Sequence, residues 1–499
     1  MNEPVLIAGA GPVGLTLAMA LKRLGVDVRV ADEAAARTDK SKALVIWPRT
    51  LELLDIQGCA QTFVDAGHPV VGARILAERK LLVEVRLDTA RSTYRSALMI
   101  AQSQTERLLE EQLAGLCMQV ERQVALESFA EDEAGVTATL RHADGREESM
   151  RAAYLIGCDG AHSAVRHGLG AQFEGDTLPS DWILADLSLD GAIARDEIMV
   201  CWAPEGVLVL FPISGDRFRV IADIAPGGQE AAPPRLEAVQ TLLDERGPSG
   251  LRAHDPIWMS NFHINERKVK SYRKGRVFLC GDAAHVHSPA GGQGMNTGMQ
   301  DAFNLAWKLA MVWHDQAASA LLDSYSPERS AIGAQVLRNA GNLTKLAILQ
   351  NPILQEIRNL AVGALGRIPS LRQRLVDQMT EVDLNYRGHG LTVNPPPRGA
   401  SHRPAGGERA PDVATAGATG SHLHDLLRTG RFAVLSVGAS PLTLPESLQA
   451  IAVAAHAQAT PDYDSGHIYL IRPDAYVMVS CKDGDATPIV HALERIAAG

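Results

Sequence analysis

Hydrophobic positions near the N-terminus form two strand-length runs separated by a helical pattern. The apolar runs are Val5–Ala8 and Val26–Ala31, and between them the apolar residues of Leu15–Leu24 recur with the spacing of one helix face. This order predicts a β-α-β unit with two parallel strands at the start of the chain.

The middle of the chain alternates apolar and polar residues, a pattern typical of strands with one buried face. Such segments are Val136–Leu140, Val207–Phe211 and Phe218–Ala222, and turn-forming residues such as those at 143–145 and 214–216 separate them. We therefore expect antiparallel sheet here rather than further β-α-β units.

The pattern becomes mostly helical from Asn296 to about Leu375, with Pro352 and Pro369 as breaks. Residues 387–420 are then dense in Gly, Pro, Ala and Ser, which predicts a linker or a long surface loop. A small α/β domain is expected beyond it, with strands at Arg431–Val437, Ile468–Ile471 and Ala475–Val479 and helices near Ser447–Ala457 and Ile489–Ala498.

Composition and charge restrict the class of protein. With 499 residues, 46% of them apolar, the chain can bury a large core and divide into two or three domains. The formal charge of -10 and the absence of any run of five Lys or Arg argue against nucleic acid. No signal segment or bilayer-length apolar stretch is found, so we expect a cytoplasmic protein without membrane partners. The six cysteines have no metal-ligand spacing, so no metal site is expected.

A glycine-rich turn follows the first predicted strand and opens the first predicted helix. In Gly9-Ala10-Gly11-Pro12-Val13-Gly14, the first glycine permits the tight turn, the second lets the backbone approach a pyrophosphate, and the third lets helix and strand pack closely. Asp32, at the end of the second strand, is placed to accept hydrogen bonds from an adenosine ribose. The loop alone does not separate FAD from NAD.

A second constellation lies in the last third of the chain. The apolar run Val277–Cys280 ends in Gly281-Asp282, and a glycine-rich stretch at 291–296 leads into a long helical pattern. Asp282 at a strand end can hold sugar-like hydroxyl groups, and the helix N-terminus can stabilise the negative charge of a reduced flavin.

The order of these motifs resembles the single-component FAD-dependent aromatic hydroxylases over roughly the first 375 residues. The resemblance rests on the glycine turn, on residues 154–166 with Asp159-Gly160 and Arg166, and on Gly281-Asp282 with Pro289 and the glycine stretch. The tail segments at 406–412, 422–427 and 471–477 look like the thioredoxin-like C-terminal domain of the phenol and polyketide branch. This tail has no C-x-x-C, so a packing or homodimer-forming role is expected rather than dithiol chemistry.

The resemblance implies a set of FAD contacts. Lys42 stands where the family often has Arg, which keeps the charge but loses the planar fork. Asp282 is expected at the ribityl chain, Gln102 at the ribityl or phosphate region, and Asp159 at both FAD and the reductant. The whole implied set is Gly9, Ala10, Gly11, Pro12, Val13, Gly14, Asp32, Glu33, Lys42, Gln102, Val124, Asp159, Asp282, Pro289, Gly292, Gln293, Gly294, Met295 and Asn296.

The resemblance also implies the architecture, an α/β protein that is α+β overall. The expected parts are a Rossmann-like FAD-binding domain, an inserted antiparallel-sheet substrate domain, a helical segment, the linker or loop and the thioredoxin-like domain. In residue numbers these are 1–67, 101–174 and 268–350 for FAD; 68–100 and 175–267 for substrate; 351–386; 387–420; and 421–499.

The chemistry implied by the family is hydroxylation of a phenolic or polycyclic aromatic ring with O2 and transient NADPH or NADH, through a flavin C4a-hydroperoxide. Trp182, Trp202 and Phe211-Pro212 are candidate pocket residues, although ordinary sheet core is the favoured explanation of each. His285 and His287 are near the flavin motif, but no catalytic residue is assigned. Two alternatives stay open: an antibiotic-modifying flavin monooxygenase and a non-catalytic FAD-binding scaffold.

Overall fold

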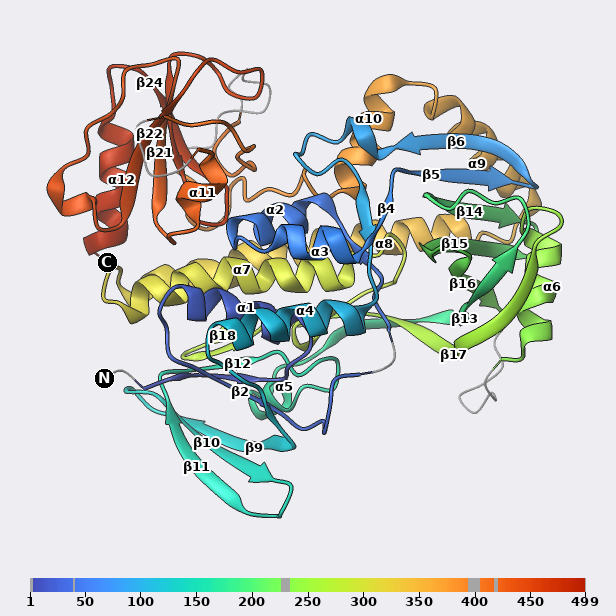
Figure 1. Cartoon of the computed structure of the whole chain (residues 1–499), viewed down its shortest axis with the longest axis horizontal. Helices are drawn as coiled ribbons and strands as arrows, with labels where there is room; N and C mark the ends of the chain where they lie inside the picture. The colour runs from blue at the N-terminus through green and yellow to red at the C-terminus, as the bar shows by residue number, and fades with distance from the viewer. Residues whose placement is uncertain (1–2, 39–40, 226–233, 394–403, 417–420, 499) are drawn as a thin grey trace.

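The computed structural model describes residues 3–38, 41–225, 234–393, 404–416 and 421–498. Figure 1 shows one long helix, α7, in the middle of the molecule, a large sheet to one side of it and a small C-terminal domain against the other end. A three-stranded antiparallel ribbon of residues 124–152 projects at the bottom of the view.

The N-terminal β-α-β prediction is confirmed. Strand β1 (Val5–Ala8) pairs in parallel with β2 (Val28–Asp32) and with β12 (Tyr154–Gly157), and α1 (Pro12–Arg23) connects β1 to β2. The six-stranded sheet has the order β18-β19-β12-β1-β2-β8, so the carboxyl ends of β1, β2, β12 and β19 meet along one edge. The remaining strands are β19 (Val277–Leu279), β8 (Glu121–Arg122) and β18 (Arg273–Lys274).

Several smaller elements surround this sheet. The projecting ribbon visible in Figure 1 is antiparallel, as the alternating pattern predicts. Strands β3, β7 and β4 form a further short sheet in that order. These elements are β9 (Val124–Glu131), β10 (Val136–His142), β11 (Glu147–Ala152), β3 (Val45–Ile46), β4 (His68–Val70), β7 (Ala97–Met99), α2 (Pro48–Ile56), α3 (Ala60–Ala66), α4 (Gln102–Gly115), α5 (Ala164–Gly168) and the 3-10 turn η1 (Leu87–Thr89).

The large sheet has eight strands in the order β20-β17-β13-β16-β15-β14-β5-β6. One face packs on α6 (Leu236–Arg246), and the other carries an apolar cluster against the ends of α8 (Tyr325–Ala347) and α9 (Pro352–Leu365). Its edge strand β20 directly follows the turn that contains Asp282, so this turn joins the two large sheets. The strands are β5 (Gly72–Ala77), β6 (Lys80–Arg86), β13 (Glu174–Asp190), β14 (Glu197–Ala203), β15 (Gly206–Ser214), β16 (Arg217–Ile224), β17 (Arg252–Lys268) and β20 (His285–Val286).

The helical region predicted from Asn296 onwards is present. Pro352 and Pro369 each occupy the first turn of a new helix, where a missing N–H costs nothing. The helices are α7 (Gly294–Trp313), α8 (Tyr325–Ala347), α9 (Pro352–Leu365) and α10 (Pro369–Met379), with the turn η3 (Ser319–Ser324) between the first two.

The C-terminal domain is a four-stranded sheet in the order β22-β21-β23-β24, in which β21 and β22 are parallel and the other pairs antiparallel. The helix expected near Ser447–Ala457 is wrong: the segment forms a 3-10 turn and strand β22, because pairing with β21 outweighs the helix preference of its alanines. The elements are α11 (Leu423–Leu427), β21 (Phe432–Val437), η4 (Glu446–Leu448), β22 (Ala452–Ala457), β23 (His467–Ile471), β24 (Val477–Lys482) and α12 (Thr487–Ala498).

The expected linker is partly an interface instead. Residues 404–407, 409 and 410 are buried, and Arg409 forms an ion pair of 2.8 Å with the buried Glu52 of α2. These residues are therefore not a surface loop. Composition could not show this, because a buried ion pair between distant residues leaves no local pattern. The part of 387–420 at 394–403 and 417–420 lies outside the described residues. Among the described helices, none combines the length and apolar character that crossing a bilayer requires.

Candidate functional site

The turn between β1 and α1 has one open side. A side chain at Gly14 would place its Cβ 2.0 Å from the Gly9 carbonyl oxygen, so this position keeps strand and helix in close contact. At Gly11, by contrast, an added Cβ would meet no atom within 4 Å. No side chain caps α1, whose first-turn N–H groups therefore remain available for an anion.

Asp32 fixes the conformation of this turn and forms an ion pair with Arg122. Its carboxylate accepts hydrogen bonds from the Ala10 and Ala34 N–H groups at 2.6 and 2.9 Å, and Arg122 lies 3.2 Å away. Three of its roughly four lone-pair sites are therefore used within the protein, and one remains for a ribose hydroxyl. Glu33 beside it is exposed.

A hollow of about 350 Å³ adjoins this ion pair, lined by Arg37, Leu113, Met118 and Arg122 among others. Val124, two residues beyond Arg122, is buried at the start of β9. The hollow is large enough for a flat heteroaromatic group next to Asp32.

Gln102 and Lys42 differ in what they leave free. Gln102 accepts a hydrogen bond from the Ala43 N–H at 3.1 Å and donates one to Glu106 at 2.9 Å, so its amide is engaged by the protein. Lys42 is exposed, and its charge counteracts the rise in the pKa of Asp282, which places its ammonium near that carboxylate.

Asp159 follows β12 and has two distinct oxygens. One accepts the Val165 N–H at 3.1 Å at the start of α5, so that oxygen is used within the protein. The other is buried and has no partner within the described part of the chain. Arg166 is buried rather than at the surface, and it donates to the carbonyls of Ala161 and Ala283 at 2.8 and 3.3 Å, which ties this segment to the Asp282 turn.

Asp282 lies in η2 (Gly281–Ala283) at the meeting point of both large sheets. Its side chain is open to solvent, yet surrounding protein raises its pKa, with the charges of His285 and Lys42 opposing that rise. Solvent therefore reaches this acid although the neighbouring chain surrounds it. Its carboxylate makes no hydrogen bond within the residues the structure describes, so it is free to accept hydroxyl groups.

Close backbone packing brings the N-terminal parts of α1 and α7 against the turn of Asp282. An added Cβ at Gly281 or at Gly298 of α7 would lie 2.8 or 2.7 Å from the Val13 side chain of α1. The turn of Asp282 and the N-terminal part of α7 therefore lie side by side.

The side chains that open α7 stabilise the protein itself. Asn296 accepts the Trp47 N–H at 2.9 Å and donates to the Val45 carbonyl at 2.8 Å, while Gln293 donates to the Gln378 carbonyl at 3.0 Å. Met295 is buried. Among the predicted contacts here, Pro289, Gly292 and Gly294 are partly accessible, so the segment offers chiefly backbone to a ligand.

The two histidines of this region differ. His285 is buried and bonded to Asp301 at 2.8 Å. His287 pairs its Nδ1 with the Ser288 carbonyl at 2.9 Å, so its Nε2 carries a lone pair, and that atom has no partner within the described chain. Burial, aided by His285, lowers the pKa of His287 to about 4, which keeps the ring neutral near pH 7.

The large sheet supplies an aromatic face. Trp182 and Trp202 are buried in one apolar cluster with Phe211 packed against it, and both indole N–H groups lack an acceptor within the described residues. Unpaired donors beside apolar walls are expected where a polar ring substituent binds.

Sequence reasoning missed the residues that join the domains. Arg219 forms a buried ion pair with Asp186 at 2.7 Å and donates to the Lys42 carbonyl at 2.8 Å, which holds the Lys42 segment against the large sheet. Trp47 donates to the Gly291 carbonyl at 2.9 Å. No local pattern could have identified them, because their partners lie far away in the chain.

The groups gathered at this site fit FAD. Gly11 leaves open the space that a pyrophosphate needs, Asp282 offers an unpaired acid, and Asp159 has an unpaired buried oxygen. No group of three metal-ligating side chains occurs in the described residues.

Comparison with known proteins gives a consistent result. Residues 2–340 match a family described as FAD binding domain, and 403–498 match the aromatic-ring hydroxylase C-terminal family. The 6-methylpretetramide 4-monooxygenase of Streptomyces rimosus is 38% identical over 398 residues, 78% of this chain and 71% of that protein. The rifampicin monooxygenase of Streptomyces venezuelae is 34% identical over 396 residues, 78% of this chain and 81% of its own. The structure of OxyS anhydrotetracycline hydroxylase from Streptomyces rimosus superposes with a TM-score of 0.80 over 100% of both chains, at 29% identity.

Proposed function

The chain belongs to the FAD-dependent aromatic-ring hydroxylases, and on that premise we propose how its own residues bind the cofactor and the substrate. It is a monooxygenase that hydroxylates aromatic compounds. Bound FAD supplies the oxygen chemistry, so the residues of this chain bind, orient, shield and move protons.

The surface around Asp282 is the proposed FAD site. The observation that carries it is a carboxylate that makes no hydrogen bond within the described residues, next to two helix N-termini. Asp282 would accept ribityl hydroxyls, Lys42 would balance nearby negative charge, and the α1 turn at Gly11 would hold the pyrophosphate. Asp32 and the adjacent hollow would receive the adenosine.

NADPH or NADH is the proposed reductant. The chain has a single dinucleotide-binding turn, at 9–14, which FAD would occupy, so the nicotinamide would bind only for hydride transfer. Asp159 has an unpaired oxygen within the described residues, and its Cα would lie 2.8 Å from a Cβ added at Gly9 of the glycine turn, so it is a candidate contact for the nicotinamide cofactor.

The aromatic face of the large sheet is the proposed substrate wall. A fused-ring phenol would pack on Trp182, Trp202 and Phe211 and would satisfy the unpaired indole N–H groups through a carbonyl or hydroxyl. The relatives named for tetracycline-type compounds support a polycyclic substrate, and the rifampicin relative supports an antibiotic as the alternative.

His287 is the proposed hydrogen-bond acceptor for the substrate hydroxyl. Its Nε2 lone pair has no partner in the part of the chain that the structure describes, whereas His285 is hydrogen-bonded to Asp301. It also lies beside the first residue of α7, since a Cβ at Gly294 would be 3.6 Å from the His287 ring. This position is between the proposed flavin site and the large sheet.

The deciding experiment is oxidation of NADPH and NADH by the FAD-loaded protein against a panel that runs from phenol through naphthols to anthracycline- and rifamycin-type compounds. The expected result is faster oxidation with a fused-ring phenol and a product heavier by one oxygen atom. Slow peroxide release that no compound accelerates would contradict the proposal and favour an FAD-binding scaffold.

A further inference from the structure

A set of buried hydrogen bonds joins the C-terminal domain to the long helices. Arg472, which follows β23, donates to Glu328 of α8 at 2.7 and 3.0 Å and to Asp474 at 2.9 and 2.6 Å. Asn304 of α7 donates to the same two carboxylates at 2.9 and 3.1 Å. The domain and both helices therefore share one pair of acceptors.

The same set continues to the turn that holds Asp282. The Tyr386 hydroxyl receives hydrogen bonds from Asn304 at 3.2 Å and from Arg329 of α8 at 3.0 Å. Arg329 pairs with Asp301 of α7 at 2.5 Å, and the other oxygen of Asp301 accepts the backbone N–H of Gly281 at 3.1 Å. The hydrogen bonds thus run unbroken from Arg472 to the residue that precedes Asp282.

We call this set of side chains the buried relay; its members are Arg472, Asp474, Glu328, Asn304, Tyr386, Arg329, Asp301 and Lys308. Its charges balance, with three cations facing three carboxylates: Lys308, Arg329 and Arg472 against Asp301, Glu328 and Asp474. All six are at most 2% exposed. A buried ion network contributes little stability compared with an apolar core of the same volume, but it fixes geometry tightly. That property suits positioning better than it suits simple adhesion.

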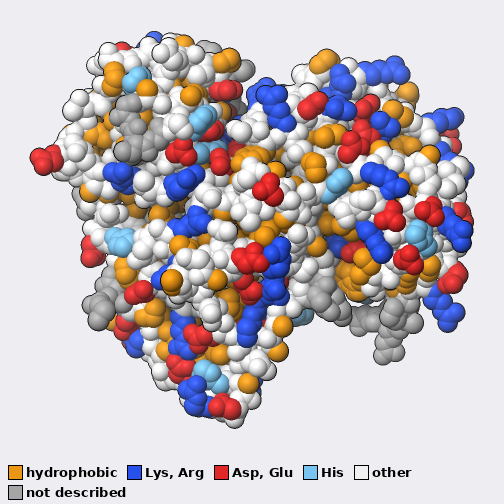
Figure 2. All heavy atoms as spheres, viewed as in Figure 1, with side chains coloured by type: hydrophobic (Ala, Val, Ile, Leu, Met, Phe, Trp, Pro, Cys, Tyr) orange, Lys and Arg blue, Asp and Glu red, His pale blue; other side chains and the backbone are white. Residues whose placement is uncertain are grey.

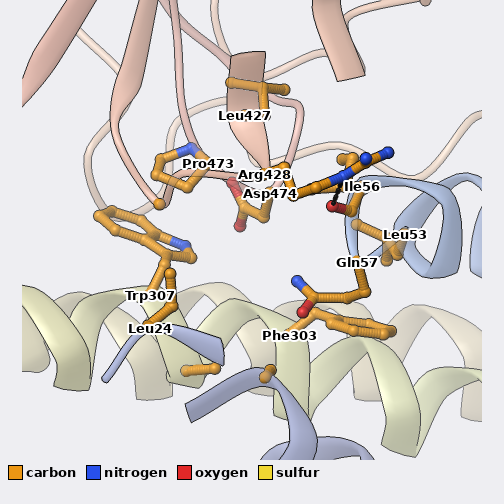
Figure 3. Close-up of a pocket in the computed structure, with 13 residues that line it drawn as sticks. Leu24, Leu53, Ile56, Gln57, Phe303, Trp307, Leu427, Arg428, Pro473 and Asp474 are labelled. Carbon is orange, nitrogen blue, oxygen red and sulfur yellow. Dashed lines mark hydrogen bonds between the residues drawn. The ribbon is translucent and has the colours of Figure 1, made fainter. Parts of the chain in front are cut away.

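The contact between the C-terminal domain and α7 leaves little room for a ligand. Figure 3 shows its cavity between Trp307 and Phe303 of α7 and the segment of Pro473 and Asp474. Its volume of about 20 Å³ holds about one water molecule. The domain therefore acts here through contact rather than through a bound molecule.

We propose that the C-terminal domain is a positioning element of the cofactor site. Arg472, through the buried relay, fixes α7 and α8 relative to each other and so sets the place of Asp282 with respect to the α7 N-terminus. Arg472 is a positioning residue, since it contacts neither cofactor nor substrate. The inference rests on the proposed function in that Asp282 holds FAD.

Tyr386→Phe tests the middle of the buried relay without leaving an unpaired charge. Tyr476→Phe is the matched control, because its ring lies 4.3 Å from that of Tyr386 while its hydroxyl makes no hydrogen bond within the described residues. FAD affinity of the apoprotein, the midpoint potential of bound flavin and its visible circular dichroism are measured. We expect FAD binding about five- to tenfold weaker and a shifted potential in Tyr386→Phe alone. Equal effects in both variants would overturn the proposal.

Arg472→Lys tests the far end and keeps the charge while losing the fork. It should weaken FAD binding although it lies in another domain, and the double variant with Tyr386→Phe should bind no worse than the weaker single variant. Additive losses, or unchanged affinity in Arg472→Lys, would refute the buried relay. If Tyr386→Phe does not fold, Arg472→Lys carries the test.

Asp282→Ala separates the two hypotheses. Loss of FAD in Asp282→Ala with intact binding in Tyr386→Phe and Arg472→Lys would reject the buried relay and leave the proposed function in place. Retained FAD in all three would reject the proposed cofactor site as well.

Discussion

Two alanine substitutions in the first glycine turn should have opposite effects. At Gly11 an added methyl group enters open space, and the backbone there is extended, with φ -75° and ψ -175°, so alanine fits without strain. At Gly14 the methyl carbon would lie 2.0 Å from the Gly9 carbonyl oxygen and 3.2 Å from Cys158 Cβ. Gly11→Ala should therefore fold normally, whereas Gly14→Ala should not.

The magnitudes follow from these contacts. Gly11→Ala should stabilise the apoprotein by roughly 0.4 to 1 kcal/mol through the unfolded chain. It should weaken FAD by about 10- to 150-fold, because losing one charge-assisted hydrogen bond to a phosphate costs about 1.5 to 3 kcal/mol. Gly14→Ala presses on rigid backbone, which costs about 1 to 3 kcal/mol or more.

The assay pairs thermal unfolding of the apoproteins with FAD titration followed by flavin fluorescence. The expected signature is Gly11→Ala with unchanged or higher melting temperature and poor FAD binding, and Gly14→Ala with a lowered melting temperature. Tight FAD binding by Gly11→Ala, within about threefold of the unchanged protein, would show that the pyrophosphate does not approach there.

Three further predictions concern titratable groups. Asp282→Ala should weaken FAD binding about 10- to 100-fold with little change in apoprotein stability, since no described partner is lost. Substitution of the exposed Asp216 by alanine is the control, and unchanged flavin occupancy in Asp282→Ala would contradict the proposed role. Burial raises the pKa of Glu381 to about 8, so stability should fall by up to about 1.4 kcal/mol per pH unit between about pH 5 and 8 and then level off. Glu381→Gln should remove that slope in urea unfolding, and parallel pH profiles would refute it. His287→Gln should lower the yield of hydroxylated product per NAD(P)H by about 10- to 100-fold at unchanged FAD affinity. In the unchanged protein the contribution of the neutral ring should disappear only as pH falls through about 4. A product yield of His287→Gln equal to that of the unchanged protein would exclude this role of His287.

Local patterns predicted most elements but not their partners. The β1-α1-β2 unit, the antiparallel middle strands and the proline-started helices α9 and α10 follow from spacing and capping rules that operate within a few residues. Strand β22 was expected as a helix, because its alanines favour helix locally and only the neighbouring β21 makes it a strand.

The candidate site shows the same division. Gly9, Gly11, Gly14 and Asp282 are recognisable in the sequence because the roles proposed for them depend on backbone geometry at a strand end. The side chains of Gln293 and Asn296 turned out to stabilise the protein through Gln378 and Trp47, which are remote in sequence. Pairing between distant residues leaves no periodic trace, so a single sequence cannot reveal it.

The buried charges at the C-terminal domain also affect how this family can be recombined. Arg409 and Arg472 each have their carboxylate partner, Glu52 and Glu328, in a different part of the chain. A C-terminal domain grafted from a relative would bury an unmatched charge unless each arginine is transferred together with its carboxylate partner. Each broken pair would cost about 3 to 5 kcal/mol. Exchange of substrate specificity is therefore best attempted by replacing the large sheet alone, with α2, α7, α8 and the tail kept from one parent.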